Sequence, residues 1–245
     1  MRPTKALEKL YKRALGQLRR WASIAKVANR PDRRQWSSSL PISAVQSIQK
    51  GAARYSYRGV RMLKNPFEMA LYPLLLWQLK PRTVIEIGSN TGASAVWFAD
   101  LMATYGIDGK VISVDIAVPE PNLQRQDVIF LKGDALKLGD VLTPEMLSSI
   151  NRPLLVIEDS AHYPETSRAV LEFFDPVLQP GEYIVIEDGN VTDLGIAHKF
   201  RGGPGVAIAE FLARARGRYE IDAGLCDFYG PNFTGNTNGY LKRIA

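Results

Sequence analysis

Residues 83–92 read TVIEIGSNTG, a short apolar run interrupted by Glu86 that passes into a turn with two glycines. A helical stretch from Ala93 to Thr104 follows directly. An apolar run of this length, bounded by a glycine turn and a helix, is typical of a buried strand in a parallel α/β sheet. The turn is therefore expected at the carboxyl edge of the sheet, where such folds bind ligands.

The same pattern continues along the chain. Further apolar runs lie at residues 111–115, 128–131, 154–158 and 183–187, and helices are predicted at residues 66–80, 93–104 and 164–178. Two later runs, near residues 219–221 and 239–241, predict a final antiparallel pair. We therefore expect an α/β fold with a doubly wound, mostly parallel, seven-stranded sheet.

Composition narrows the class of protein. The 245 residues suit one main domain, and a hydrophobic share of 46% with 23% charged residues excludes collagen-like, coiled-coil and wholly disordered chains. The single cysteine, Cys226, cannot form an internal disulfide, and there is no CxxC motif or Cys/His cluster for zinc. The sequence also lacks a long apolar run and the features of a signal peptide. We predict a cytoplasmic protein, neither membrane-spanning nor secreted.

The net charge of +6 is unevenly distributed. Residues 1–30 hold nine Lys or Arg and one acid, a net +8, so the other 215 residues carry −2. A body with this charge argues against a nucleic-acid partner. The first thirty residues also place apolar side chains at helical spacing, which predicts a basic amphipathic helix.

This helical extension has two interpretations. It either lies on an anionic membrane surface, as a peripheral membrane contact, or packs against the domain or a partner subunit of a homo-oligomer. We predict packing, because the apolar stripe is narrow and Gly16 interrupts it. Residues 31–65 are polar and contain breakers such as Pro31 and Gly51, which predicts an irregular connection or lid. The main domain is expected at residues 66–245.

Acids lie at the ends of the first three strands. Glu86 stands where a dinucleotide-binding pattern has glycine, and it would repel a pyrophosphate but suits a positively charged ligand such as S-adenosylmethionine. Asp115 is placed to accept hydrogen bonds from ribose hydroxyls, and Asp134 to meet an adenine amino group. Any one of them alone is better explained as a solvated loop residue or a helix cap. Together they predict an adenosyl ligand without phosphates.

Acids also end the fourth and fifth runs, at Asp159, Glu187 and Asp188. If these strands are neighbours, the three carboxylates converge and repel one another unless a cation or protons neutralise them. A hard divalent ion such as Mg²⁺ prefers oxygen ligands, so we predict a metal site. The alternative is that some of these acids cap helices or pair with Arg168 or Arg201.

His162 lies three residues after Asp159, at the mouth of the same cleft. An imidazole there is suited to remove a proton from a metal-bound hydroxyl at neutral pH. The alternative is a structural histidine at a helix start. The other histidine, His198, has no acidic residues beside it in the sequence, and we assign it no role.

Four stretches resemble one protein family: EIGSNTGASA at residues 86–95, DSAH at 159–162, YIVIED at 183–188 and NGYLKR at 238–243. They resemble the cephalosporin hydroxylase and rhamnosyl O-methyltransferase family, whose members are class I, Rossmann-like, S-adenosylmethionine-dependent methyltransferases. The likeness covers about residues 55–245 at domain scale. It implies a methyltransferase domain at residues 66–245.

The resemblance also implies roles for single residues. It implies Mg²⁺ ligands at Asp159, Glu187 and Asp188, a general base at His162, and cofactor contacts from Glu86, Gly88, Asn90, Ser94 and Asp115. The chain departs from some relatives, which carry an acid where Ala161 stands, and residues 192–203 diverge. The acceptor pocket is therefore not implied.

These observations predict a Mg²⁺-dependent O-methyltransferase that acts on a sugar hydroxyl. The expected acceptor is a mannoside or rhamnoside of a polysaccharide, a glycolipid or a glycosylated natural product. Mg²⁺ would lower the pKa of the hydroxyl, and His162 would take its proton. The alternatives are methylation of a small phenol or catechol, and a non-catalytic module that binds RNA or a membrane.

Overall fold

The computed structural model of the chain describes residues 34–119 and 125–245. The basic extension predicted at residues 1–30 lies outside the described residues. All elements named below belong to one compact unit, residues 35–245. No helix in the described part of the chain is both long and apolar enough to cross a membrane.

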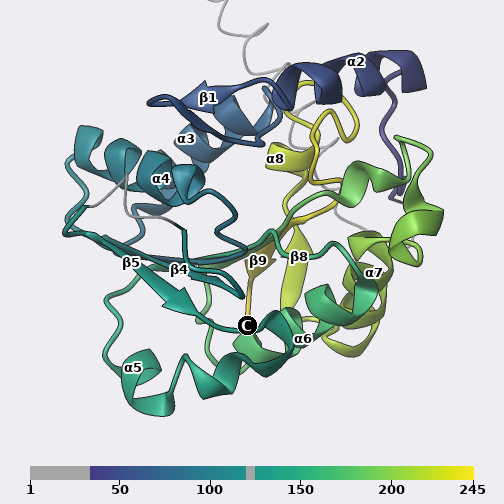
Figure 1. The fold of residues 1–245 in the computed structure, drawn as a ribbon. Helices are drawn as coiled ribbons and strands as arrows, with labels where there is room; N and C mark the ends of the chain where they lie inside the picture. The colour runs from purple at the N-terminus through teal and green to yellow at the C-terminus, as the bar shows by residue number, and fades with distance from the viewer. Residues whose placement is uncertain (1–33, 120–124) are drawn as a thin grey trace, which may run out of the picture. The chain divides into compact units, whose positions relative to one another are not determined.

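A seven-stranded sheet forms the centre of this unit, with strand order β5-β4-β3-β6-β7-β9-β8 (Figure 1). Its strands are β3 (Thr83–Ile87), β4 (Lys110–Asp115), β5 (Val128–Lys132), β6 (Leu154–Glu158), β7 (Tyr183–Ile186), β8 (Tyr219–Ile221) and β9 (Tyr240–Arg243). The strands from β5 to β7 are parallel, whereas β9 pairs antiparallel with β7 and β8. The predicted seven-stranded, doubly wound sheet is confirmed, including its final antiparallel pair.

Helices cover both faces of the sheet. In Figure 1, α3 (Glu68–Leu79) and α4 (Ala93–Thr104) lie on one face, and α6 (Pro164–Phe174) and α7 (Pro204–Arg214) lie on the other. The prediction of α4 matches the observed bounds, and α3 ends before Pro81 as expected. Helix α6 ends at Phe174, earlier than predicted, and Pro176 follows two residues later with no backbone N–H to continue the helical hydrogen bonds.

The remaining helices are short and lie in the connections. They are η3 (Ala135–Asp140), α5 (Pro144–Ser148), η4 (Gly189–Val191), η5 (Ala197–Phe200) and α8 (Ala223–Cys226). Two of them, η4 and η5, follow β7 and contribute Asn190, Val191 and Phe200 to a cavity at the carboxyl edge of the sheet. These connections were not predicted as helices, because single turns carry almost no periodic signal.

The segment at residues 31–65 is more ordered than the sequence suggests. Its described part holds α2 (Ile42–Ala52) and a hairpin of β1 (Ser56–Tyr57) and β2 (Val60–Arg61). The helix begins directly after Pro41, and the two hairpin turn residues, Arg58 (φ 51°) and Gly59 (φ 82°), adopt the left-handed conformations of a tight hairpin turn. The expectation of irregular structure is therefore wrong here, since the breakers separate short elements. Movement of the segment as a lid stays a prediction.

The core sits in the central strands. All five residues of β3 and all five of β6 are buried, and the two strands pair in register, with Ile87 beside Glu158. The predicted adjacency of β6 and β7 is also confirmed, since Glu158 pairs with Ile186. The carboxyl ends of the five parallel strands therefore lie along one edge of the sheet, which brings the residues that follow them into one region.

Candidate active site

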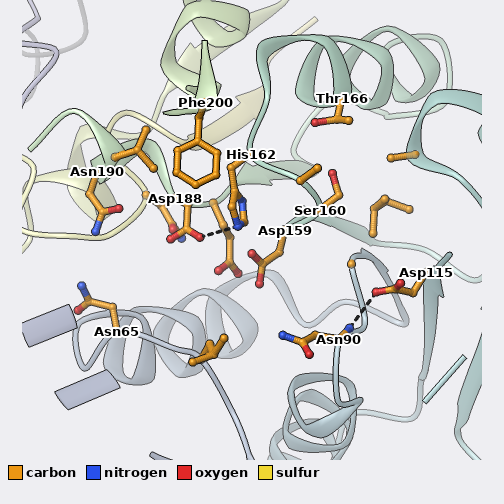
Figure 2. A pocket seen from close by; sticks show the side chains of 18 of the residues that line it. Asn65, Asn90, Asp115, Asp159, Ser160, His162, Thr166, Asp188, Asn190 and Phe200 are labelled. Atoms are coloured by element: carbon orange, nitrogen blue, oxygen red, sulfur yellow. Dashed lines mark hydrogen bonds and ion pairs between the residues drawn. The ribbon is translucent and has the colours of Figure 1, made fainter. Parts of the chain in front are cut away.

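A cavity of about 840 Å³ opens at this carboxyl edge (Figure 2). The residues that follow five successive parallel strands contribute to its wall, namely Gly88, Asn90, Asp115, Asp134, Asp159, His162, Glu187 and Asp188. Its volume lies in the range of small-molecule sites. The parallel topology alone therefore gathers most of the predicted site residues around one cavity.

An acidic cluster lies in the middle of this cavity. Asp159, His162 and Asp188 each offer one possible ligand atom, and these atoms all lie within 4.8 Å of one another. His162 Nε2 is 3.1 Å from Asp188 Oδ2, a contact drawn in Figure 2. His162 Nδ1 is buried without a hydrogen-bond partner. Two carboxylates and one imidazole nitrogen at these distances fit the donor set of a divalent cation.

Glu187 also lines the cavity, but it has other partners. Its Oε1 accepts hydrogen bonds from Lys64 Nζ at 2.6 Å and from the Tyr72 hydroxyl. It is not part of the compact group of three possible ligands described above. The role of Glu187 as a metal ligand stays a prediction.

Lys64 is a member of the site that sequence analysis missed. It lies between β2 and α3, its side chain is only 2% exposed, and its Nζ is 2.6 Å from both Asp159 Oδ2 and Glu187 Oε1. Lys64 is one of many basic residues in the chain, and its neighbours in sequence do not predict burial. Its importance comes from contacts with residues 95 and 123 positions away.

Burial and mutual repulsion shape the electrostatics of this cluster. Burial raises the pKa of Asp159 to about 6 against the opposing effect of Lys64. Burial, with Asp159 adding to it, raises the pKa of Glu187 to about 7. For Lys64, burial by itself would lower the pKa, but Asp159 and Glu187 outweigh it and the pKa is raised. The site therefore keeps one ammonium group and still favours a further cation.

Left-handed backbone marks three non-glycine residues of the site. They are Asn90 (φ 46°), His162 (φ 59°) and Asp188 (φ 55°), and each one lies shortly after a strand. This conformation is unfavourable for residues with a Cβ, and it concentrates at functional sites. It is part of how the turns after β3, β6 and β7 present their side chains to the cavity.

The turn after β3 packs against the end of β6. Gly88 has a φ of 106°, and a Cβ added there would lie 2.0 Å from the backbone oxygen of Asp159, so only glycine allows this approach. The Asn90 N–H donates to Asp115 Oδ2 at 2.9 Å, which joins the turn to the end of β4. Asp134 caps η3 by accepting from the Leu136 N–H at 2.9 Å. The four residues Gly88, Asn90, Asp115 and Asp134 all line the cavity.

Two predicted cofactor residues, Glu86 and Ser94, do not line this cavity. Glu86 lies within β3, is fully buried and accepts a hydrogen bond from Ser113 Oγ at 2.6 Å. A residue before the end of a strand points into a packing layer, whereas the residues after the strand reach the edge. Contact of Glu86 and Ser94 with a cofactor stays a prediction.

The alternative pairing of the acids with arginines is wrong. Arg168 pairs with Glu210 at 2.6 Å, and Arg201 pairs with Glu165 at 3.1 Å. Both arginines are therefore paired with glutamates outside the acidic cluster. Lys64 is the basic residue that the structure places against Asp159 and Glu187.

A polar wall faces the acidic cluster from the side away from Asp115. It is formed by Asn65, Glu68, Asn190 and Asn236. In Figure 2, Asn65 and Asn190 lie on one side of Asp188 and Asp159, and Asn90 and Asp115 on the other. The cavity thus has two ends with the cluster between them.

Burial favours the protonated form of Glu68 in the folded protein. Its Oε1 accepts from the Thr234 hydroxyl and from the Gly235 N–H at 2.9 Å, while Oε2 is buried without a partner. Burial outweighs these hydrogen bonds and raises its pKa to about 8 from an ordinary 4.5. Between these two values the folded protein holds a proton that the unfolded chain has lost, so stability falls as the pH rises through this window.

The substitution Glu68→Gln tests this assignment. The amide keeps the shape of the protonated acid and has no charge to bury, so we expect the variant to be close to wild type at about pH 5 and more stable than it at about pH 8.5. The measurement is the free energy of unfolding in urea, with EDTA present, at both pH values. An equal stability difference at the two pH values would contradict the raised pKa.

Comparison with known proteins gives consistent matches. The family model described as Rhamnosyl O-methyltransferase/CmcI matches residues 49–244. The rhamnosyl O-methyltransferase of Mycobacterium leprae is 32% identical over 197 residues, which cover 77% of this chain and 82% of the relative. That of Mycobacterium tuberculosis is 30% identical over 195 residues, which cover 77% and 78% of the two chains.

Solved structures of CmcI are similar as well. One, named for its SAH complex, has a TM-score of 0.59 and 29% identity, and the match covers 79% of this chain and 84% of that one. Another, named for Mg and SAM, has a TM-score of 0.58 and 28% identity, with 79% and 78% covered.

Proposed function

The chain belongs to the rhamnosyl O-methyltransferase/CmcI family, and we propose that it transfers the methyl group of S-adenosylmethionine to a sugar hydroxyl, with Mg²⁺ as a second cofactor. Membership confirms the predicted enzyme class, an S-adenosylmethionine-dependent O-methyltransferase with the class I fold. It also sets aside a purely non-catalytic module. The proposal rests on one observation. Asp159, His162 and Asp188 lie together in one cavity, between the end lined by Asn90 and Asp115 and the polar wall that includes Asn65 and Asn190.

The end formed by the turns after β3, β4 and β5 suits the methyl donor. Gly92, the N-cap of α4, has no capping side chain, and the Ala93 N–H donates to Thr91 Oγ1 at 3.4 Å, so the N–H groups that follow in the first turn are the ones that can meet the carboxylate of the methionine part. Asp115 accepts only backbone hydrogen bonds and keeps lone pairs for two ribose hydroxyls. We assign Gly88 and Asn90 to the methionine part, and Asp134 to the adenine.

The acidic cluster suits the divalent ion. Asp159 and Asp188 would hold Mg²⁺, together with Glu187 as the sequence predicts, because hard ions prefer carboxylate oxygens. A bound Mg²⁺ would lower the pKa of a hydroxyl that it coordinates. His162 is then left to accept the proton of that hydroxyl through Nε2, the nitrogen that faces the acids.

The opposite wall suits an acceptor with several hydroxyls. Asn65, Asn190 and Asn236 carry amide groups that both donate and accept hydrogen bonds, and they line the cavity beside Glu68. A sugar needs such paired groups at fixed positions, whereas a phenol needs a mainly apolar slot. The matched relatives are named for a rhamnosyl acceptor, so a rhamnoside is our first candidate and a mannoside our second.

Transfer of a labelled methyl group tests the proposal. The full chain is incubated with labelled S-adenosylmethionine and Mg²⁺, and with rhamnosides, mannosides or catechols as acceptors. We expect label in a sugar and none in a catechol. Label in catechols alone would replace the sugar by a phenol acceptor. A rate that does not change when Mg²⁺ is replaced by EDTA would remove the metal from the mechanism.

The predictions about assembly and location stay proposals. We propose a cytoplasmic homo-oligomer that binds no nucleic acid, in which residues 1–30 pack against the domain or a partner subunit. Peripheral membrane contact through the same residues is the alternative. Both interpretations concern residues outside the described ranges.

A further inference from the structure

Lys64 bridges two of the acids that are proposed to bind Mg²⁺. Its ammonium group is buried, and it lies 2.6 Å from Asp159 Oδ2, at the end of β6, and 2.6 Å from Glu187 Oε1, at the end of β7. The Tyr72 hydroxyl, from α3, donates to the same Glu187 oxygen. The methyl-transfer reaction described above gives Lys64 no part.

These contacts offset a charge repulsion that the fold creates. Parallel pairing of β6 and β7 brings Asp159, which is partly buried, close to the buried Glu187, and two carboxylates in such a site repel each other. A buried charge is tolerated when it is paired and hydrogen-bonded. Lys64 therefore supplies, within the chain itself, part of the positive charge that a metal ion would bring.

The charges around the cluster match a divalent ion. Asp159, Glu187 and Asp188 are three carboxyl groups and Lys64 is one ammonium group, so with the carboxyl groups ionised and His162 neutral the cluster carries two negative charges. One divalent ion neutralises it. Without Lys64 the loaded site would keep one negative charge, and its attraction for cations would be greater.

We propose that Lys64 is a positioning residue that holds Asp159 and Glu187 in place before the metal binds and limits the affinity of the site for divalent ions. This inference rests on the proposed metal site. It predicts that the metal-free protein depends on Lys64 for stability. It also predicts that a bound ion takes over much of this role.

The test compares Lys64→Met with the matched control Lys137→Met, at an exposed lysine of η3. The unfolding temperature of each full-length protein is measured in EDTA and in Mg²⁺, and Mg²⁺ affinity is measured by calorimetry. We expect Lys64→Met, and not the control, to lose stability in EDTA and to gain more from Mg²⁺ than wild type does. We also expect it to bind Mg²⁺ about tenfold more tightly or better.

Any other outcome contradicts either the proposal for Lys64 or the proposed metal site. If Lys64→Met loses the same stability with and without Mg²⁺, or binds Mg²⁺ no more tightly than wild type, the proposal for Lys64 is wrong. If wild type itself binds no Mg²⁺, the metal part of the proposed function fails instead. If Lys64→Met does not fold in either buffer, the double variant Lys64→Met/Glu187→Gln, which removes the cation and one of its carboxylates together, is expected to fold in EDTA. Failure of the double variant to do so would overturn the proposal.

Discussion

His162→Ala is expected to lower the turnover number by about 10²-fold or more and to leave S-adenosylmethionine binding unchanged. The imidazole Nε2 lies 3.1 Å from Asp188 Oδ2 and faces the acidic cluster, whereas Nδ1 is buried. A neutral sugar hydroxyl is a poor nucleophile, so loss of the group that accepts its proton slows the transfer. The donor end of the cavity does not involve this side chain, and donor binding should be spared.

The measurement combines steady-state kinetics with calorimetry of the donor and of Mg²⁺. His198→Ala is the control, since His198 is exposed on η5 and does not line the cavity. An unchanged turnover in His162→Ala would rule out the base. A loss of Mg²⁺ binding would instead make His162 a ligand, which its place beside Asp159 and Asp188 also permits.

The strands were the most predictable part of the fold. The bounds of β3 and β6 match the apolar runs of the sequence, because both strands are buried on both faces and every residue contributes to the signal. Helix ends were less predictable, as the early end of α6 shows. The β1–β2 hairpin was missed because strands of two residues carry almost no periodic signal, and α2 was missed because Pro41 and Gly51 beside and within it were interpreted as breakers of an irregular connection.

The acidic cluster was predictable for a topological reason. Consecutive parallel strands that lie side by side deliver the residues after them to the same edge, so Asp159 and Asp188 meet without further information. The orientation of a side chain within a strand was not predictable in this way. Glu86 follows the same acid-at-strand-end pattern, yet it lies inside the packing layer and bonds to Ser113.

Lys64 shows why the rest of the site could not be predicted from one sequence. It reaches the cluster from the segment before α3, and no local pattern distinguishes it from the other lysines of the chain. Only the packed structure reveals that its ammonium group is enclosed by Asp159 and Glu187. The left-handed conformation of His162 has the same origin, since tertiary packing and not local preference selects it.

Removal of the metal is expected to have the largest effect on the reaction. EDTA should lower sugar methylation by about 10³-fold, because the acceptor hydroxyl then loses the positive charge that favours its deprotonation. Asp188→Asn should have the same effect at any moderate Mg²⁺ concentration, since the amide keeps the shape of the side chain and loses its charge. Asp140→Asn, at an exposed position of η3, is the control and should behave as wild type.

EDTA treatment and the Asp188→Asn variant together distinguish the loss of a bound metal from damage to the fold. Among the described residues the Asp188 side chain pairs with His162, so its amide variant should still fold in EDTA but should gain nothing from Mg²⁺. Wild type should gain stability from the same Mg²⁺ concentration, which shows whether the ion binds at all. If wild type is fully active in EDTA, or if Asp188→Asn keeps both its Mg²⁺-induced stabilisation and its rate, the carboxylates between β6 and β7 do not hold a catalytic ion.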